Sequence, residues 1–391
     1  MNLPPRSTSS PATLNLSAPN AVMHASDTLF VQAALELAAL GRNSCAPNPP
    51  VGCLMVRDGQ VIGRGYHKQA GGPHAEVAAI ADAGGDVAGA TAYVSLEPCA
   101  FEGRTPACAL TLIEARVARV VVGAQDPHPQ VAGKGNELLR QAGIEVRVLE
   151  LPEAVAMIAG FKSRILRQRP RVVLKTASSL DGAVALSNGD SQWITGEQAR
   201  RQVQELRACS DAVLTGAGTV IADDPLLNVR DPELLQGNLQ QPLRVVLDPK
   251  LRVPGQRQIL SPGTLVVHAQ GPDAQYPDVA AGTVEYLSLP DDPIDLAALL
   301  EALANRGCNN VLVEAGPKLL GSFLRPRQGP PLWDEWICFV APKVLGADSQ
   351  SLADFALSEL SLAPNATVVE QTRVGEDVRL RLVPASNASD H

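Results

Sequence analysis

Residues 71–85 read GGPHAEVAAIADAGG, and this stretch decides the fold of the first half of the chain. The Gly-Gly-Pro turn interrupts the preceding structure, and the Ala-rich run favours a helix that begins near His74. Before it, VGCLMV (residues 51–56) and VIGRGY (61–66) are typical of two strands joined by a hairpin, in which Asp-Gly supplies positive φ angles. After it, TAYVSL (91–96) predicts a third strand. Strands and helices in this order indicate a layered α/β domain.

The alternation continues along the whole chain. We expect helices at residues 27–41, with Asp27 as N-cap, and at 107–115, 136–143, 152–168, 196–208, 294–305 and 317–324. We expect strands at residues 118–123, 144–149, 171–177, 211–218, 243–248, 264–269, 310–316 and 335–342. The basic, turn-prone RQRPR places a domain boundary near Arg169, although the helix at 152–168 fits either side. The predicted parts are a disordered tail (1–24), a first domain (25–168) and a second domain (169–391).

Composition limits the classes of function. The 391 residues are 45% hydrophobic and 19% charged, which suits two packed domains. A formal charge of −8 and 3% aromatic residues argue against nucleic acid as a partner, while a small phosphorylated ligand stays compatible. The odd number of cysteines, 7, favours reduced thiols and a metal site over disulfides. Without a signal-like stretch or a long apolar run, we expect a cytoplasmic protein that does not enter a membrane.

Four residues form a pattern that predicts catalytic zinc. His74 opens a helix, Cys99 follows a strand, and Cys108 comes nine positions later. One imidazole and two thiolates leave the fourth zinc position to water, whose pKa zinc lowers to about 7. Glu76 lies two residues after His74, where it can move protons without binding the metal. A His-x-Glu followed by Pro-Cys indicates a deaminase that uses zinc hydroxide on a nucleobase.

Other interpretations fit parts of this pattern. A lone histidine at a helix start is usually a cap or a surface residue, and a lone cysteine is usually a small buried hydrophobe. A zinc-stabilised interaction module would not need Glu76. A tRNA or nucleoside deaminase would have two residues between its cysteines, whereas this chain has eight. The insertion brings Arg104 and Thr105 beside the metal, where they can hold a phosphorylated substrate.

Together these motifs resemble the bifunctional deaminase/reductase family of riboflavin biosynthesis. Its deaminase half carries PNPxVGC, GxH, HAE, LEPC and GRTPxC, which this chain has at residues 47–53, 65–67, 74–76, 96–99 and 103–108. DPHPQVAG at residues 126–133 continues the resemblance, which covers nearly the whole chain after residue 25. Two departures concern substrate recognition: Ala100-Phe101-Glu102 stands where the family often has Ser-His-His, and Ala107 replaces a proline.

The second domain resembles the reductase half of the same family. The matching segments are KTASSLDG (175–182), SQWIT (191–195), ELRA (205–208), GAGTV (216–220), ADDPLLNVR (222–230) and VEAGP (313–317). A strand, a Gly turn and a helix starting at Pro317 offer N–H groups and a dipole end to a phosphate. The glycine pair at 216–218 lacks the third glycine of a Rossmann fingerprint, so that fold is not indicated.

The resemblance implies specific binding residues. Those for NADPH are Ala177, Trp193, Thr219, Asp223, Gly316, Pro317, Lys318, Leu319, Leu320 and Gly321. Those for substrate are Asn48, Arg104 and Thr105 in the deaminase, and Ser191, Arg207, Leu227, Arg230 and Glu314 in the reductase. Arg207 and Arg230 suit the ribose phosphate as bidentate partners. Alternatively, both arginines are solvated surface charges, Trp193 belongs to the core, and Asp181 is a turn residue.

The fold implied by the resemblance is α/β, with an N-terminal cytidine-deaminase-like three-layer α/β/α domain and a C-terminal dihydrofolate-reductase-like α/β domain. The implied reactions are zinc-hydroxide deamination of 2,5-diamino-6-ribosylamino-4(3H)-pyrimidinone 5′-phosphate and NADPH-dependent reduction of its ribosyl chain to ribityl. We expect one Zn²⁺ per chain, NADPH, a small phosphorylated pyrimidine as substrate, and a homo-oligomer.

Overall fold

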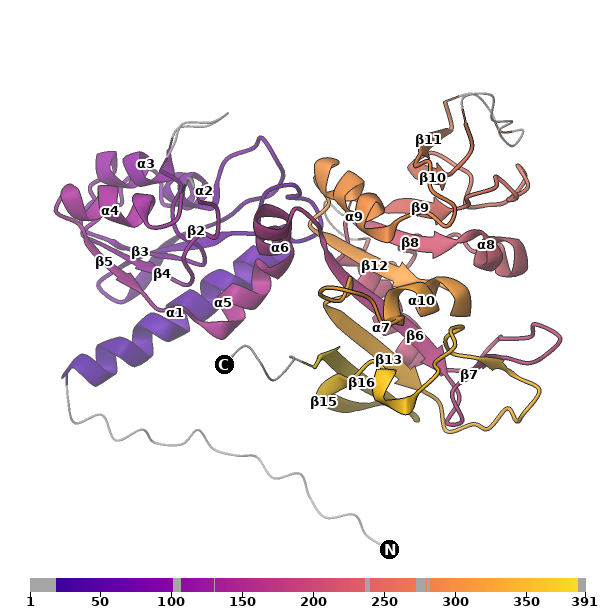
Figure 1. Ribbon diagram of the computed structural model, residues 1–391. Coiled ribbons are helices and arrows are strands. Elements are labelled where there is room, and N and C mark those ends of the chain that lie inside the picture. Colours follow the sequence, from indigo (N-terminus) through magenta and orange to yellow (C-terminus); the bar gives the residue numbers. More distant parts are fainter. Residues whose placement is uncertain are drawn as a thin grey trace, which may run out of the picture.

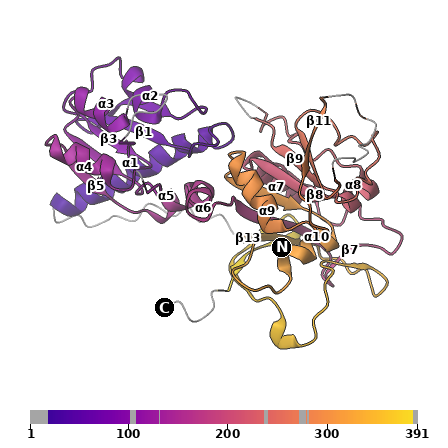
Figure 2. The same ribbon diagram turned by 45° about the horizontal axis from the view of Figure 1, so that its top comes forward.

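The computed structural model describes residues 19–100, 107–129, 131–235, 240–271, 279 and 282–385, with side chains from residue 26 onward. Two domains lie side by side, and helix α6 (Ala159–Arg167) lies where they meet (Figure 1). The view in Figure 2 shows the same separation into two sheets. In the described part of the chain, no helix has the length and apolarity that a membrane crossing requires.

The N-terminal domain contains one mixed sheet. Its strands are β1 (Gly52–Arg57), β2 (Gln60–Tyr66), β3 (Thr91–Val94), β4 (Arg119–Val122) and β5 (Glu145–Val148), in the order β2-β1-β3-β4-β5. Its helices are α1 (Pro19–Gly41), α2 (Ala75–Asp82), α3 (Cys108–Glu114), α4 (Lys134–Gln141) and α5 (Pro152–Met157). The strands β3, β4 and β5 are parallel, and β1 pairs antiparallel with both β2 and β3. The predicted hairpin joins β1 to β2, with positive φ at Asp58 and Gly59.

Side chains that alternate along the strands create two apolar faces. Cys53 and Met55 of β1 pack in a cluster with residues of α2, α3 and α4, whereas Leu54 and Val56 pack with residues of α1. This is the period of two that a strand imposes on its side chains. The sheet is therefore covered on both faces, and the predicted three-layer α/β/α domain is confirmed.

The first helix differs from the prediction. It begins at Pro19, so Asp27 lies inside α1 and is not its N-cap. The Asp27 carboxylate is fully buried and accepts two hydrogen bonds from Arg119, at 2.8 and 2.9 Å, one from Arg147 at 2.8 Å and one from Tyr93 at 3.1 Å. The aspartate thus ties α1 to β3, β4 and β5.

The C-terminal domain is built on a nine-stranded sheet. Its strands are β6 (Arg171–Ser178), β8 (Ala212–Gly216), β9 (Leu243–Leu247), β10 (Thr264–His268), β11 (Val284–Ser288), β12 (Asn310–Glu314), β13 (Glu335–Val340), β15 (Ala366–Val374) and β16 (Asp377–Pro384). The order is β11-β10-β9-β8-β12-β6-β13-β16-β15, parallel up to β13 and antiparallel beyond it. A small second sheet pairs β7 (Ala183–Ala185) with β14 (Gln350–Ser351).

Helices cover both faces of the large sheet. Residues of α9 (Leu296–Asn305) and α10 (Pro317–Leu324) pack in one cluster with the strands, and residues of α7 (Glu197–Ala208) and α8 (Ala217–Asp223) pack in another on the opposite face. A 3₁₀ turn, η1 (Leu360–Leu362), precedes the final hairpin. The α/β class predicted for this domain is confirmed.

Several elements were not predicted. β15 has five exposed residues out of nine, so the regular burial that would mark a strand is missing from its sequence. β11 follows a Pro- and Asp-rich stretch, and β7 and β14 are only three and two residues long. Helix α8 was not predicted either: Gly216 is its N-cap residue, and Gly218 lies in its first turn. Strands with little buried surface leave little hydrophobic pattern to recognise.

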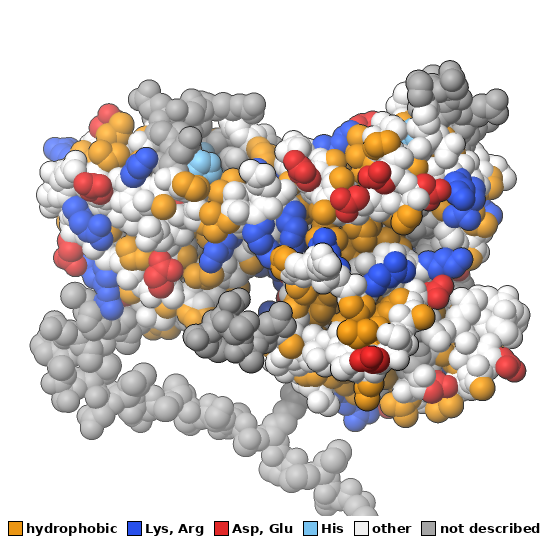
Figure 3. Space-filling view, viewed as in Figure 1, with side chains coloured by type: hydrophobic (Ala, Val, Ile, Leu, Met, Phe, Trp, Pro, Cys, Tyr) orange, Lys and Arg blue, Asp and Glu red, His pale blue; other side chains and the backbone are white. Residues whose placement is uncertain are grey.

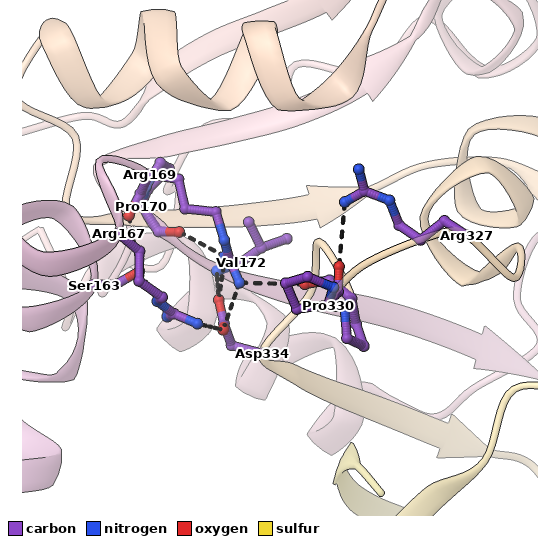
Figure 4. Close-up of polar contacts among 9 residues, drawn as sticks. Ser163, Arg167, Arg169, Pro170, Val172, Arg327, Pro330 and Asp334 are labelled. Carbon is purple, nitrogen blue, oxygen red and sulfur yellow. Dashed lines mark hydrogen bonds and ion pairs between the residues drawn. The ribbon is translucent and has the colours of Figure 1, made fainter. Parts of the chain in front are cut away.

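The helix expected at residues 152–168 is divided in two at Ile158. α5 packs against α1 in the first domain, and α6 leads directly into β6 of the second. Asp334 fastens this junction: its carboxylate accepts hydrogen bonds from Arg167 at 2.7 Å, from Arg169 at 2.7 and 3.0 Å, and from the backbone N–H of Val172 at 2.8 Å (Figure 4). The nearby Arg327 donates to the Pro330 carbonyl.

We expect Asp27→Asn to lower the free energy of unfolding of the first domain by about 3 kcal/mol at pH 7, because it leaves two arginines without their buried anion. Burial works to raise the pKa of Asp27, but Arg119, Tyr93 and Arg147 together hold it below its ordinary value. The stabilisation is therefore present above about pH 4 and disappears as the pH falls through the lowered pKa.

Urea denaturation of both proteins at pH 7 and at pH 3.5 measures this difference, which should shrink at the lower pH. The matched control is Asp86→Asn, whose carboxylate is 74% exposed and pairs with Arg57 at 3.3 Å. Such a surface pair contributes about 0.5 kcal/mol or less. Equal effects of the two substitutions would contradict the role given to Asp27.

Candidate functional site

Three predicted metal ligands meet at one end of the five-stranded sheet. His74 is the N-cap residue of α2, Cys108 is the first residue of α3, and Cys99 follows β3. Their ligand atoms all lie within 4.8 Å of one another. His74 Nδ1 is 3.1 Å from Cys108 Sγ and 3.7 Å from Cys99 Sγ, and the Cys108 backbone N–H donates to Cys99 Sγ at 3.2 Å. The structure thus brings together residues separated by up to 34 positions.

The donor set fits a zinc ion. Tetrahedral zinc with sulfur and nitrogen ligands requires those atoms to be about 3.5–3.8 Å apart, close to the distances found. A hydrogen bond from the Cys108 thiol lowers the pKa of Cys99 to about 4, and the same bond raises that of Cys108. The lowered pKa of Cys99 favours the thiolate form that binds a divalent cation.

Glu76 lies in the first turn of α2 and faces the same cluster. Its side chain is 3% exposed, and burial raises its pKa above the ordinary value. The carboxyl group also contacts the Cys108 thiol. A buried carboxyl with a raised pKa, next to three metal ligands, suits a group that accepts and returns protons.

Asn48 and His67 lie beside the metal ligands, with the His67 ring centroid 5.1 Å from that of His74. Asn48 Nδ2 lies 3.0 Å from His67 Nε2, and His67 Nδ1 lies 3.0 Å from the carbonyl oxygen of Pro73, next to His74. His67 is 2% exposed, and burial lowers its pKa, so its ring is neutral and donates from Nδ1 to Pro73. Its position in the GxH motif was the signal for this role, although we did not predict it as a site residue.

These residues line a cavity of about 590 Å³. Its lining includes His74, Glu76 and Cys99 of the cluster together with Asn48 and His67. Phe161, Arg164 and Ile165 of α6 also line it. Glu97 of the LEPC motif also lines the cavity. Its carboxylate accepts hydrogen bonds from the N–H groups of Asp126, Gly133 and Asn136 at 3.3, 2.9 and 3.2 Å. Glu97 was not predicted either. Arg104 and Thr105, predicted to bind substrate, lie outside the described residues.

In the second domain, Arg207 and Glu314 form a buried ion pair. Arg207 Nε and Nη2 donate to the two carboxylate oxygens at 2.5 and 2.9 Å, and Nη1 donates to the Asn228 carbonyl at 3.2 Å. Lys175 Nζ lies 3.7 Å from the same carboxylate. Burial alone would raise the pKa of Glu314, but Arg207 and Lys175 hold it below its ordinary value.

This arrangement changes the expectation for Arg207. The guanidinium was predicted as a clamp for the ribose phosphate, with a solvated surface charge as the alternative. It is instead 8% exposed, and all three of its nitrogens donate to acceptors within the domain. Lys175, which begins the KTASSLDG motif, is the residue that sequence reasoning missed in this cluster.

The predicted cofactor residues gather at the carboxyl ends of parallel strands. Gly316 follows β12 and precedes α10, and its N–H donates to Thr219 Oγ1 of α8 at 3.0 Å. Ala177 lies near the end of β6, the strand beside β12. The first-turn N–H groups of α10 have no acceptor within the helix and suit a phosphate. Leu319 and Leu320 are buried in the core, and Gly321 is also buried. The two leucine side chains therefore belong to the core and not to the predicted phosphate site.

The remaining predicted residues are more dispersed. Leu227 is 5% exposed and packs in the core near α7 and α8. Arg230 and Asp223 are exposed, and Ser191 is half-buried on the loop after β7. Trp193 on the same loop is 63% exposed with Arg200 over its ring at 4.5 Å, so it is not a core residue. Asp181 is a turn residue whose carboxylate accepts from the N–H groups of Leu345 and Gly346 at 3.1 and 2.8 Å.

Comparisons with known proteins find relatives of both domains. Residues 24–124 match the cytidine and deoxycytidylate deaminase zinc-binding region, and residues 170–380 match the RibD C-terminal domain. The riboflavin biosynthesis protein RibD of Escherichia coli is 46% identical over 92% of this chain and 100% of its own length. That of Haemophilus influenzae is 43% identical over 92% and 97%.

Solved structures are similar over the same extent. RibD of Acinetobacter baumannii has a TM-score of 0.82 at 41% identity and covers 92% of this chain and 99% of its own. A diaminohydroxyphosphoribosylaminopyrimidine deaminase/5-amino-6-(5-phosphoribosylamino)uracil reductase of Thermotoga maritima has a TM-score of 0.83 at 35% identity and covers 93% and 99%. The chain therefore belongs to the RibD family of riboflavin biosynthesis proteins.

Proposed function

We propose that the chain deaminates 2,5-diamino-6-ribosylamino-4(3H)-pyrimidinone 5′-phosphate in its first domain and reduces the ribosyl chain of the product to ribityl in its second. The observation that carries the first activity is the cluster of His74, Cys99 and Cys108 beside buried Glu76, within a cavity large enough for a nucleotide-sized ligand. The second activity rests on family membership and on the polar cluster at the carboxyl ends of β6 and β12.

For deamination, His74, Cys99 and Cys108 would hold zinc, which acts as a Lewis acid and lowers the pKa of a bound water to about 7. Glu76 would accept a proton from the attacking water and deliver it to the ring nitrogen as the new C–O bond forms. It would then take the remaining proton from the new hydroxyl group and pass it to the exocyclic amine, so that the carbonyl forms, the C–N bond breaks and ammonia leaves. Asn48, fixed by His67, would orient the pyrimidine ring.

For reduction, the first turn of α10 would bind a cofactor phosphate, with Ala177, Trp193, Thr219 and Asp223 around the rest of the cofactor. A nicotinamide cofactor supplies the hydride when it is bound. Glu314, held by Arg207, would position the substrate, the exposed Arg230 would bind its phosphate, and Ser191 would also contact the substrate. Because Arg207 donates to Glu314 and Asn228, we assign it to positioning Glu314 and not to the phosphate.

We further propose NADPH as the reductant, a cytoplasmic location and a homo-oligomeric state. The reduced cysteines, which form no disulfide, support a reducing compartment. The small phosphorylated substrate needs no membrane and no nucleic acid.

We expect one zinc per purified wild-type chain by elemental analysis. Cys99→Ser combined with Cys108→Ser should remove it, since a serine hydroxyl is a far weaker zinc ligand than a thiolate. Cys338→Ser, a change at a buried cysteine of the second domain, is the control and should keep its zinc. Stoichiometric zinc in the double variant would assign the metal to other residues.

Glu76→Gln should retain zinc and fold but lose deamination by a factor on the order of 10²–10⁴, because the amide cannot accept and return a proton. Ammonia release measures the loss. The same variant, given the already deaminated aminouracil phosphate, should oxidise NADPH at the wild-type rate.

The reciprocal control is Glu314→Gln, which should impair reduction and leave ammonia release intact. Deamination by the Glu76 variant would exclude Glu76 as the proton shuttle. Loss of reduction in that variant while it remains folded and zinc-loaded would contradict two separate sites.

Initial rates with NADPH should exceed those with NADH at equal concentration. Both rates are measured, with deaminated substrate present, as the decrease in absorbance of the reduced nicotinamide over time. A faster reaction with NADH would overturn the assigned preference.

A further inference from the structure

The deaminase cavity has a wall that connects it directly to the reductase domain. Phe161, Arg164 and Ile165 of α6 line the cavity, and β6 of the reductase sheet begins four residues after this helix ends. In Figure 1, α6 lies between the two sheets, and Figure 3 shows Lys and Arg side chains gathered where the two domains meet. The positions of residues on this wall therefore depend on the structure of both domains.

Arg164 connects three segments at this wall. Its Nη2 donates to the carbonyl oxygen of Pro47 at 2.8 Å, and its Nε donates to Asn309 Oδ1 at 2.7 Å. Asn309 Nδ2 donates to the same Pro47 oxygen at 3.2 Å. The Pro47 carbonyl oxygen of the deaminase domain thus accepts hydrogen bonds from α6 and from the reductase domain.

Asn309 is held firmly in place by its own domain. It is 4% exposed and directly precedes β12. The backbone N–H groups of Asn309 and Asn310 donate to Asp211 Oδ2 at 2.8 and 2.7 Å. A Cβ atom at Gly160 of α6 would lie 2.4 Å from Asn310 Oδ1, and one at Gly307 would lie 3.0 Å from the Pro47 side chain. Tight packing on both sides leaves this contact little freedom to shift.

Pro47 is next to the residue that faces the substrate. Asn48 contacts His67, and His67 contacts the Pro73 carbonyl beside the metal ligand His74. A short path of hydrogen bonds and one peptide bond thus leads from Asn309 in the reductase to the binding edge of the deaminase. Displacement of the Pro47 carbonyl would move Asn48 relative to the cluster.

We propose that Asn309 and Arg164 are positioning residues for deamination: together they fix the loop that carries Asn48, so that a residue of the reductase domain sets the affinity of the deaminase for its substrate. This inference rests on the deamination proposed above. It explains why the guanidinium in the cavity wall donates two of its hydrogen bonds to protein acceptors, Pro47 and Asn309.

The test uses the full chain with separate assays for ammonia release and for NADPH oxidation with deaminated substrate. Asn309→Ala and Arg164→Gln should each raise the KM of deamination on the order of tenfold, as expected for the loss of hydrogen bonds to a buried group, with a smaller change in kcat. Zinc content should not change. Reduction should continue at the wild-type rate, which also shows that β12 and its domain are folded.

Arg167→Gln is the matched control. Arg167 lies one turn further along α6 and donates to Asp334 and Ser163 but is not part of the cavity wall, so its loss should leave the KM of deamination unchanged. Asn309→Asp is a second variant that keeps the acceptor for Arg164 and places an oxygen against the Pro47 carbonyl. It should raise the KM as well.

An unchanged KM in Asn309→Ala and Asn309→Asp would overturn the proposal. Equal losses of deamination and reduction would also overturn it, since they indicate general destabilisation. If the wild-type chain itself released no ammonia, the proposed deamination would be wrong, and this outcome is distinct from the failure of the variants.

Discussion

Two helix N-termini point at the same position beyond the end of a parallel strand, and the deaminase site depends on this meeting. α2 begins directly after His74, and α3 begins at Cys108, so both helix N-termini lie beside the cluster. The partial positive charge at each terminus stabilises thiolates and favours ionisation of Cys99. The Cys108 N–H that donates to Cys99 Sγ is one visible part of this effect. Without the packing of both helices on one face of the sheet, the three ligands would not converge.

The cluster could be predicted because metal chemistry restricts residue types and their order. His74, Glu76, Cys99 and Cys108 carry that signal in the sequence itself. Asn48 and His67 were quoted within motifs, but only Asn48 was given a role, because a histidine without a metal partner has no distinctive spacing. Glu97 bonds to backbone groups 29 to 39 residues away, and long-range contacts of this kind leave no local pattern.

The same difference separates the strands of the second domain from one another. Strands β6, β8 and β12 are buried and β-branched, so their sequences predicted them, whereas β15 is mostly exposed and its sequence did not. Arg207 illustrates the limit for charged residues. The sequence contains an arginine in a family motif, but only the fold shows that Glu314, 107 positions away, accepts its hydrogen bonds. The sequence therefore predicted which residues matter better than what each one contacts.

The junction between the domains has a consequence for how the protein can change over evolutionary time. Three residues, 168–170, separate α6 from β6. Asp334 binds Arg167 at the end of α6, Arg169 within this gap and the backbone N–H of Val172 in β6. Most domains are joined by exposed linkers that accept insertions readily. Here one added residue would turn α6 relative to the sheet and move a wall of the deaminase cavity. The two domains are therefore joined rigidly. An insertion in their connection should be tolerated as poorly as an insertion in the core of either domain.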